Sequence, residues 1–210
     1  MQIAGETLIP RPDKTLFWPN RKTLFLADLH LGKGAAFRAE GRPVPEGSTE
    51  ATLRRLATSI CDTGADRVIL LGDLWHALSG RDEGTQARFC GWLQAHSHLE
   101  IVLIVGNHDA RSGELRQEHL RVEQECWADS PFVYAHHPQI DAQGYVLCGH
   151  LHPGARVQGK GRQSYVLPCF WFRPEYAVLP SFGDLTGCSP VHCQAKDEVF
   201  VVADGKVLRV

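Results

Sequence analysis

The chain has 210 residues, of which 43% are hydrophobic and 22% are charged, and its formal net charge is −2. This composition is typical of a globular protein and argues against a disordered chain. The chain is also long enough for one sizeable hydrophobic core. With a sequence pI of about 6.6, the molecule as a whole does not attract polyanions. A nucleic-acid site would therefore need a local basic patch or bound metal ions.

Membrane and disulfide signals are missing from the sequence. No apolar run approaches the roughly 20 residues that cross a bilayer, and the first residues lack the basic-then-apolar layout of a signal peptide. The seven cysteines are an odd number without a Cys-x-x-Cys pair, which is typical of reduced thiols. We therefore expect a cytoplasmic protein with no membrane partner.

The first half of the chain alternates apolar runs with helical periodicity, after an opening edge strand or hairpin. This alternation predicts βαβ units with crossovers over a parallel sheet. Ser48 is the expected N-cap of the first long helix. The predicted elements are the hairpin segments 3–9 and 16–18, strands 23–27, 68–71 and 101–105, and helices 49–62 and 83–96.

After about residue 130 the apolar runs become short, with turn residues and no helical pattern between them. We expect a second, mostly antiparallel sheet that packs on the first, with helices outside and residues 1–210 forming one domain. The predicted strands are 132–135, 145–148, 165–171, 176–179, 198–202 and 206–210.

Five of the predicted strands end in side chains that can bind a metal. One such ending is usually a turn or a satisfied polar residue, but five in order predict a common metal site beyond the carboxyl ends of the strands. In an extended chain both Asp-x-His and His-x-His would point their two polar side chains to one side. The residues are Asp28 and His30, Asp73, Asn107 and His108, His136, and His150 and His152.

The chemistry of these residues narrows the choice of metal. Imidazole together with carboxylate suits Mn, Fe or Zn, whereas ligation by oxygen alone would favour Mg or Ca. A carboxylate can bridge two ions, and Asp73 is the candidate because it stands alone on a central strand. Two bridged ions are a common arrangement for phosphoryl transfer.

The motif series Asp28-x-His30, Gly72-Asp73, Gly106-Asn107-His108-Asp109, His136 and Gly149-His150-x-His152 resembles that of the calcineurin-like metallophosphoesterases. The resemblance covers residues 24–152 and implies an α/β fold, a four-layer α/β/β/α sandwich with a dinuclear metal centre. It implies that one ion is held by Asp28, His30 and His152, the other by Asn107, His136 and His150, with Asp73 between them. The expected ions are two Mn²⁺, with Fe or Zn as alternatives.

The same resemblance implies roles for the two residues that follow Asn107. His108 would face the scissile phosphate as a general acid or as a stabilising cation, and Asp109 would orient it. The sequence departs from the family pattern at two positions. His76 stands where the series usually has a carboxylate, which leaves its role open between metal surroundings and substrate. His137 follows His136 where a glycine is usual, and we favour His136 as the ligand.

A narrower resemblance, to the bacterial DNA-ligase-associated metallophosphoesterases, rests on further segments. It implies a DNA phosphodiesterase or nuclease in DNA repair, associated functionally with a DNA ligase and a helicase. The candidate substrate-binding residues are Lys33, Arg38, His76 and Arg111. The charges of Lys33 and Arg38 could equally belong to a solvated loop. The segments are 28–33, 37–38 with 44–47, 150–153 and 179–183.

The leading hypothesis is therefore a metal-dependent phosphodiesterase with DNA as its substrate. The near-neutral charge favours an alternative, a phosphodiesterase or phosphatase acting on nucleotides or other small esters. A third alternative is an interaction module that has lost catalysis, which the presence of His108 argues against. The aromatic run 170–172 is expected in the core or in the interface of a homodimer.

Overall fold

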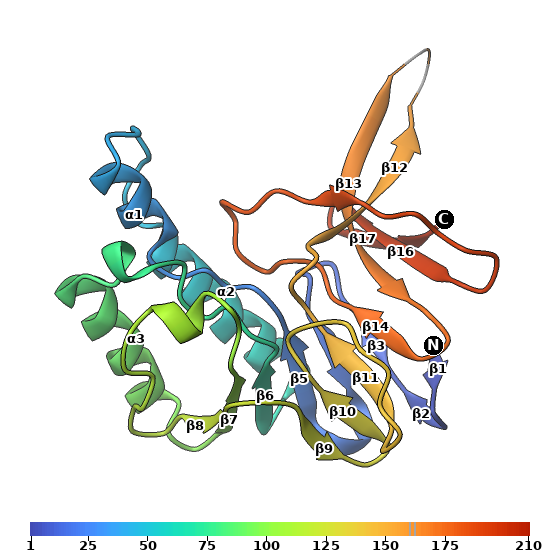
Figure 1. Cartoon of the computed structure of the whole chain (residues 1–210), viewed down its shortest axis with the longest axis horizontal. Coiled ribbons are helices and arrows are strands. Elements are labelled where there is room, and N and C mark those ends of the chain that lie inside the picture. The colour runs from blue at the N-terminus through green and yellow to red at the C-terminus, as the bar shows by residue number, and fades with distance from the viewer. Residues whose placement is uncertain (160, 162) are drawn as a thin grey trace.

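Two β-sheets packed face to face form the frame of the protein in the computed structural model, which describes residues 1–159, 161 and 163–210. Figure 1 shows the helices on one side of this frame and the second sheet on the other. Two packed sheets with helices against the first sheet form an α/β sandwich, as the sequence predicts.

The first sheet has six strands in the order β3-β4-β5-β6-β7-β8, and the four from β5 to β8 run parallel. The predicted βαβ rhythm is confirmed, and β8 is an additional strand that no sequence pattern indicated. The strands are β3 (Ile9–Pro10), β4 (Leu16–Trp18), β5 (Thr23–Leu26), β6 (Arg67–Leu70), β7 (Glu100–Ile104) and β8 (Arg121–Glu123). A separate two-stranded sheet, β1 (Gln2–Ile3) with β2 (Glu6–Thr7), precedes them.

Three α-helices follow strands of the first sheet: α1 (Lys33–Ala39), α2 (Ser48–Thr63) and α3 (Glu83–Ala95). Ser48 was expected to cap α2, but Gly47 precedes the helix in the left-handed region and Ser48 is its first residue. At α3 the Asp82 side chain accepts a hydrogen bond from the Thr85 N–H at 2.6 Å, which satisfies one free donor of the first turn. No helix among the described residues is long and apolar enough to cross a membrane.

The second sheet contains nine strands, and its centre differs from the expectation of a mostly antiparallel sheet. β10, β11 and β14 run parallel to one another, while the strands around them are largely antiparallel. A loop connects β10 to β11, and two further strands lie between β11 and β14, so no helical pattern indicates these crossovers. The strands are β9 (Trp127–Asp129), β10 (Phe132–Tyr134), β11 (Tyr145–Cys148), β12 (Pro153–Gln158), β13 (Ser164–Phe172), β14 (Tyr176–Val178), β15 (Ser189–Pro190), β16 (Glu198–Ala203) and β17 (Lys206–Arg209).

Apolar side chains point alternately to the two faces of each strand, which creates three apolar layers. In β5, Phe25 enters the core between the sheets while Leu24 and Leu26 pack toward the helices. The aromatic run also divides, since Phe170 and Phe172 join the core between the sheets and Trp171 faces outward. In the described part of the chain, all the α-helices precede residue 96. On the outer face of the second sheet the packing residue Val191 therefore comes from a non-helical segment.

The core between the sheets depends on aromatic contacts, which gives a test of the fold. Phe132 is fully buried and meets Trp18 edge to face at 4.9 Å between ring centroids. Phe132→Ala should lower the free energy of unfolding by about 3–5 kcal/mol in urea denaturation, because it leaves a cavity. Leu208→Ala, at a side chain 51% exposed, should change it by less than about 0.5 kcal/mol. Equal effects of the two substitutions would contradict this core.

Candidate metal centre

Parallel strands bring the polar loop residues of both sheets to one edge of the sandwich. Backbone hydrogen bonds tie these loops together: the Asp28 N–H donates to the Gly72 carbonyl at 3.1 Å, and the His30 N–H to the Asp73 carbonyl at 2.9 Å. In the second sheet the Gly149 N–H donates to the His136 carbonyl at 3.1 Å. The seven predicted metal ligands thus lie in loops that follow β5, β6, β7, β10 and β11.

Five of these residues adopt left-handed backbone conformations, which corrects the expectation of extended Asp-x-His and His-x-His segments. Side chains rarely tolerate this region, and such strain gathers at functional sites. Each pair therefore converges because its loop is tightly turned, not because its chain is extended. The φ values are 54° for Asp28, 49° for His30, 51° for Asp73, 71° for His150 and 47° for His152.

One group of potential ligands joins Asp28, His30 and His152, whose ligand atoms all lie within 4.8 Å of one another. The His152 Nε2 is 3.5 Å from the Asp28 Oδ1 and 3.4 Å from the His30 Nε2. Burial lowers the pKa of His30 to about 2, so its imidazole is neutral and offers a lone pair. This grouping is the one that the sequence resemblance implies for the first ion.

A second group of potential ligands surrounds His136. The hydrogen bonding of His136 leaves the lone pair of its Nε2 without a proton. The His136 Nδ1 donates to the Leu71 carbonyl at 2.9 Å, which fixes the tautomer, since burial lowers the pKa to about 4 and keeps the ring neutral. The Nε2 lone pair then faces the Asn107 Oδ1 at 3.0 Å and the Asp73 Oδ1 at 3.5 Å. A cation satisfies three converging acceptors, so the donor set fits a divalent first-row metal.

His150 and His137 complete this side of the site. The His150 ring lies 5.0 Å from that of His136 and 4.1 Å from that of His137, and the three histidines form a further group of potential ligands. The His150 N–H also donates to the Asp28 carboxylate at 3.1 Å. His136 is buried against Asp73 whereas His137 is exposed, which favours His136 as the ligand.

Asp73 lies between the two groups. Its Oδ1 accepts a hydrogen bond from the His108 N–H at 2.9 Å and lies on the His136 side. Its Oδ2 is 4.0 Å from the Nε2 atoms of both His30 and His108. Burial raises the pKa of this carboxyl group, and nearby positive charge would keep it ionised.

Two motif glycines allow this close packing. A side chain at Gly72, whose φ is 87°, would collide with the His136 imidazole, and one at Gly106 would collide with the Asp73 carboxylate. The glycines before Asp73 and Asn107 are thus required by contact with the opposite strand end.

His108 stands beside the two groups and is 39% exposed at its side chain. Its Nδ1 is 2.6 Å from the His76 carbonyl oxygen, which accepts a hydrogen bond from it. The ring of His76 stacks on that of His108 at 5.3 Å and lies 5.3 Å from that of His30. The residue that replaces the usual carboxylate therefore lies within the site, and His30, His76 and His108 form one more group of potential ligands.

The expected role of Asp109 needs correction. Its buried carboxylate accepts hydrogen bonds from the backbone N–H groups of Trp75 at 2.9 Å, Gly106 at 3.0 Å and Leu74 at 3.3 Å. The His108 imidazole instead contacts the carbonyl of His76, the residue that follows the two N–H groups of Leu74 and Trp75 bound by Asp109. Asp109 follows His108 directly in the sequence, but the sequence does not indicate that its carboxylate bonds to the backbone and not to the His108 ring.

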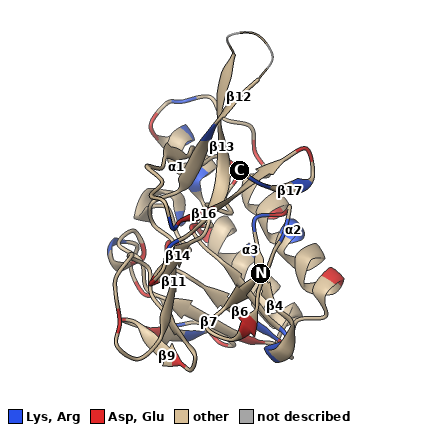
Figure 2. Cartoon of the chain, turned by 90° about the vertical axis from the view of Figure 1, so that its right-hand side faces the viewer, with Lys and Arg blue, Asp and Glu red and all other residues tan. Residues whose placement is uncertain are grey.

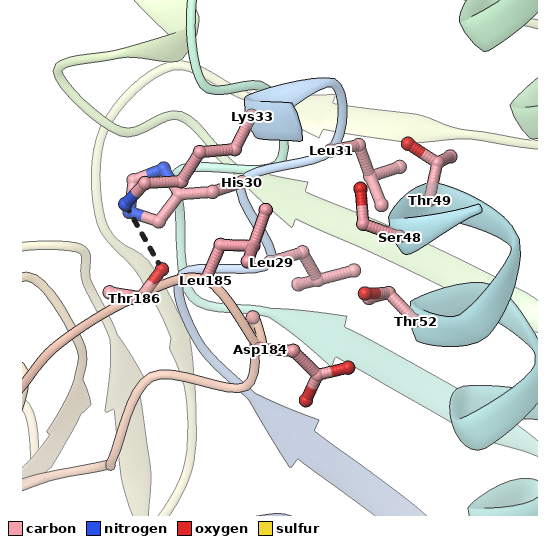
Figure 3. Close-up of a pocket in the computed structure, with 11 residues that line it drawn as sticks. Leu29, His30, Leu31, Lys33, Ser48, Thr49, Thr52, Asp184, Leu185 and Thr186 are labelled. Atoms are coloured by element: carbon pink, nitrogen blue, oxygen red, sulfur yellow. Dashed lines mark hydrogen bonds between the residues drawn. The ribbon is translucent and has the colours of Figure 1, made fainter. Parts of the chain in front are cut away.

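The predicted substrate-binding residues differ in position. Figure 3 shows the Lys33 and His30 side chains pointing the same way, with the Lys33 Nζ 3.3 Å from the Thr186 hydroxyl. Arg38 donates to the Val44 and Pro45 carbonyls at 3.3 Å, which is the behaviour of a loop-stabilising residue. Arg111 is exposed at the end of the short helix η3 (Asp109–Arg111).

Residues 181–186 make a structural contribution to the site that no sequence pattern predicted. The Ser181 hydroxyl donates to the Asp28 carbonyl at 2.9 Å and the Gly183 N–H to the same oxygen at 3.1 Å, while Thr186 reaches Lys33. Only the resemblance of segment 179–183 to the ligase-associated proteins pointed to this region. A distant segment thus holds the first metal loop in its strained conformation.

Comparison with known proteins agrees with this geometry. The family model described as calcineurin-like phosphoesterase matches residues 21–168. The chain belongs to this family. A calcineurin-like phosphoesterase is a metal-dependent hydrolase of phosphoester bonds, and the His and Asp groups here can bind the metal. A comparison with curated proteins gave no match.

Two solved structures resemble this calcineurin-like phosphoesterase over nearly its whole length. The Pseudomonas putida nuclease MPE is 33% identical, with a TM-score of 0.86, and the match covers 100% of this chain and 98% of that one. Yfce, a phosphoesterase from E. coli, is 16% identical, with a TM-score of 0.50 and coverage of 90% and 97%. The second likeness concerns the fold alone.

The contact between Gly72 and His136 gives a test of the site's packing. Gly72→Ala should reduce the metal content measured by elemental analysis, because the added carbon displaces the His136 ring. Gly205→Ala is the matched control: Gly205 also has a positive φ, of 68°, but a side chain there meets open space. Equal metal content in the two variants would contradict the assigned role of Gly72.

Proposed function

We propose that this chain is a phosphodiesterase with a dinuclear, Mn²⁺-binding centre that cleaves DNA. The observation that carries the proposal is the Asp73 carboxylate, whose two oxygens lie toward two different groups of potential ligands. In this proposal Asp28, His30 and His152 hold one ion, Asn107, His136 and His150 hold the other, and Asp73 is shared. Two such ions supply positive charge to a phosphodiester and lower the pKa of a water molecule.

His108 is the proposed general acid. Because its Nδ1 is engaged by the His76 carbonyl, the proton that it can deliver is the one on Nε2. This atom lies on the exposed side of the ligand groups, 4.0 Å from the Asp73 Oδ2. The His76 carbonyl orients the ring, and Asp109 holds the backbone that carries this carbonyl. His108 then gives its proton to the departing oxygen of the phosphodiester.

The nuclease from Pseudomonas putida supports nucleic acid as the substrate class, because it matches this chain from end to end. Lys33, beside His30, is a proposed phosphate contact, whereas Arg38 and Arg111 are proposed only as contacts to more distant parts of the strand. DNA repair, with functional association with a ligase and a helicase, remains part of the proposal. Contacts between the two sheets across one core support treating residues 1–210 as a single domain.

The proton donor can be tested by varying the leaving group. With His108→Ala, cleavage of a DNA strand should fall about 10²–10⁴-fold, since an alkoxide leaves poorly without a proton. Hydrolysis of bis(p-nitrophenyl) phosphate should fall less, because nitrophenolate is a good leaving group. His98→Ala, at an exposed histidine on the surface, should leave both rates unchanged. Equal losses on the two substrates would overturn the role of His108 as an acid, provided that metal content is retained.

The shared carboxylate can be tested through metal content. Asp73→Asn should reduce the content of both ions together, because an amide is neutral and a weaker bridge. Asp204→Asn controls for the backbone, since Asp204 is exposed with a φ of 48° while that of Asp73 is 51°. Loss of one ion with full retention of the other, measured by elemental analysis, would contradict the bridge.

A further inference from the structure

The β12–β13 hairpin is attached directly to the metal centre. β12 begins at Pro153, the residue after His152, and pairs antiparallel with β13 from Gly154 opposite Pro168 to Gln158 opposite Ser164. Figure 1 shows this hairpin projecting beyond the sandwich at the same end as α1. The outer half of the hairpin pairs with no other strand of the described residues. A two-stranded ribbon of this kind adds little to the stability of the fold, which suggests that the hairpin has a role in binding.

The charge of this region differs from that of the whole chain. The sequence from 142 to 174 contains no Asp or Glu, although the chain has 24 acidic and 22 basic residues in total. In Figure 2 the projecting strands carry blue and no red. The basic residues of this stretch are Arg156, Lys160, Arg162 and Arg173.

Arg156 is the described cation on the shaft of the hairpin. Its side chain is exposed and donates to the Ser164 hydroxyl at 3.2 Å. Among the residues that the structure describes it forms no ion pair with a carboxylate, although many other arginines of this chain do. Its guanidinium therefore keeps donors free for a phosphate.

The strand register decides which side of the hairpin this cation occupies. Ala155, Val157 and Leu167 belong to the apolar layer on the outer face of the second sheet, so Arg156 lies on the opposite face. Gly154, two residues before Arg156, shares its face, and a side-chain carbon added there would lie 2.8 Å from the Cys188 Sγ, so Cys188 packs on this face. Two residues before Cys188, the Thr186 hydroxyl is bonded to Lys33. The segment 186–188 therefore leads from the metal edge to the Arg156 face.

We propose that this face of the β12–β13 hairpin, through Arg156, binds the backbone of the nucleic-acid strand beyond the scissile phosphodiester. The inference rests on the proposed nuclease function and names a contact outside the metal centre. Arg156 is three residues beyond Pro153, or about 10 Å along an extended strand. At about 3.4 Å of rise per nucleotide, a substrate must extend roughly three nucleotides from the scissile bond to reach it.

The test compares short and long substrates in the metal-loaded enzyme. For a labelled 20-nucleotide DNA strand, Arg156→Gln should raise KM roughly fivefold near 0.1 M salt and reduce the slope of log KM against log salt by about 0.7, with kcat unchanged. Arg156→Glu should have the larger effect. Both variants should hydrolyse bis(p-nitrophenyl) phosphate and a dinucleotide at wild-type rates, which also shows that they fold.

Arg54→Glu is the matched control, because Arg54 is exposed on α2 and away from the second sheet. It should leave the KM for the 20-nucleotide strand and its salt dependence unchanged. A wild-type KM and salt slope in Arg156→Glu would overturn the role of the hairpin while leaving the nuclease function intact. Wild-type enzyme that hydrolyses the small diester but no DNA strand would instead overturn the proposed function, and the hairpin's role with it.

Discussion

The placement of one buried carboxylate, that of Asp73, constrains the rest of the structure. A carboxylate without water needs hydrogen bonds and positive charge, and burial alone raises its pKa. The His108 N–H supplies one hydrogen bond, and the imidazoles of His30 and His136 approach it from two sides. Those rings are neutral because burial lowers their pKa values, so they cannot provide the missing charge. Bound cations can provide that charge, so the arrangement is suited to metal binding.

The fold supplies the geometry for this requirement. Parallel strands in the first sheet and a parallel centre in the second place five loops along one edge. Gly72 and Gly106 let the loops approach within contact of the opposite ligands. The left-handed residues store strain that the core between the sheets and the segment from Ser181 to Gly183 must offset. The packing of residues away from the site thus holds the ligand residues in place.

The sequence predicts the members of the site better than its geometry. Polar residues after apolar runs identify eight candidates, because strand ends in α/β proteins meet at one edge. The family resemblance then separates His108 from the seven candidate ligands. The conformation of Asp28-x-His30 was predicted wrongly, since the tight turns depend on bonds to Gly72 and Asp73 that lie far away in sequence. The parallel centre of the second sheet was not predicted either, because a loop connects β10 to β11 and the β12–β13 hairpin connects β11 to β14, with no helix in either connection. The hydrogen bond from the Trp75 N–H to Asp109 and the contact of Thr186 with Lys33 also arise only from tertiary packing.

We propose that two metal ions share Asp73. Anomalous scattering from crystals grown with Mn²⁺ would locate each ion independently of activity. We expect two peaks about 3.5–4 Å apart, one beside His30 and His152 and one beside His136, with the Asp73 carboxylate between them. A single peak, or two peaks that the carboxylate does not join, would contradict it.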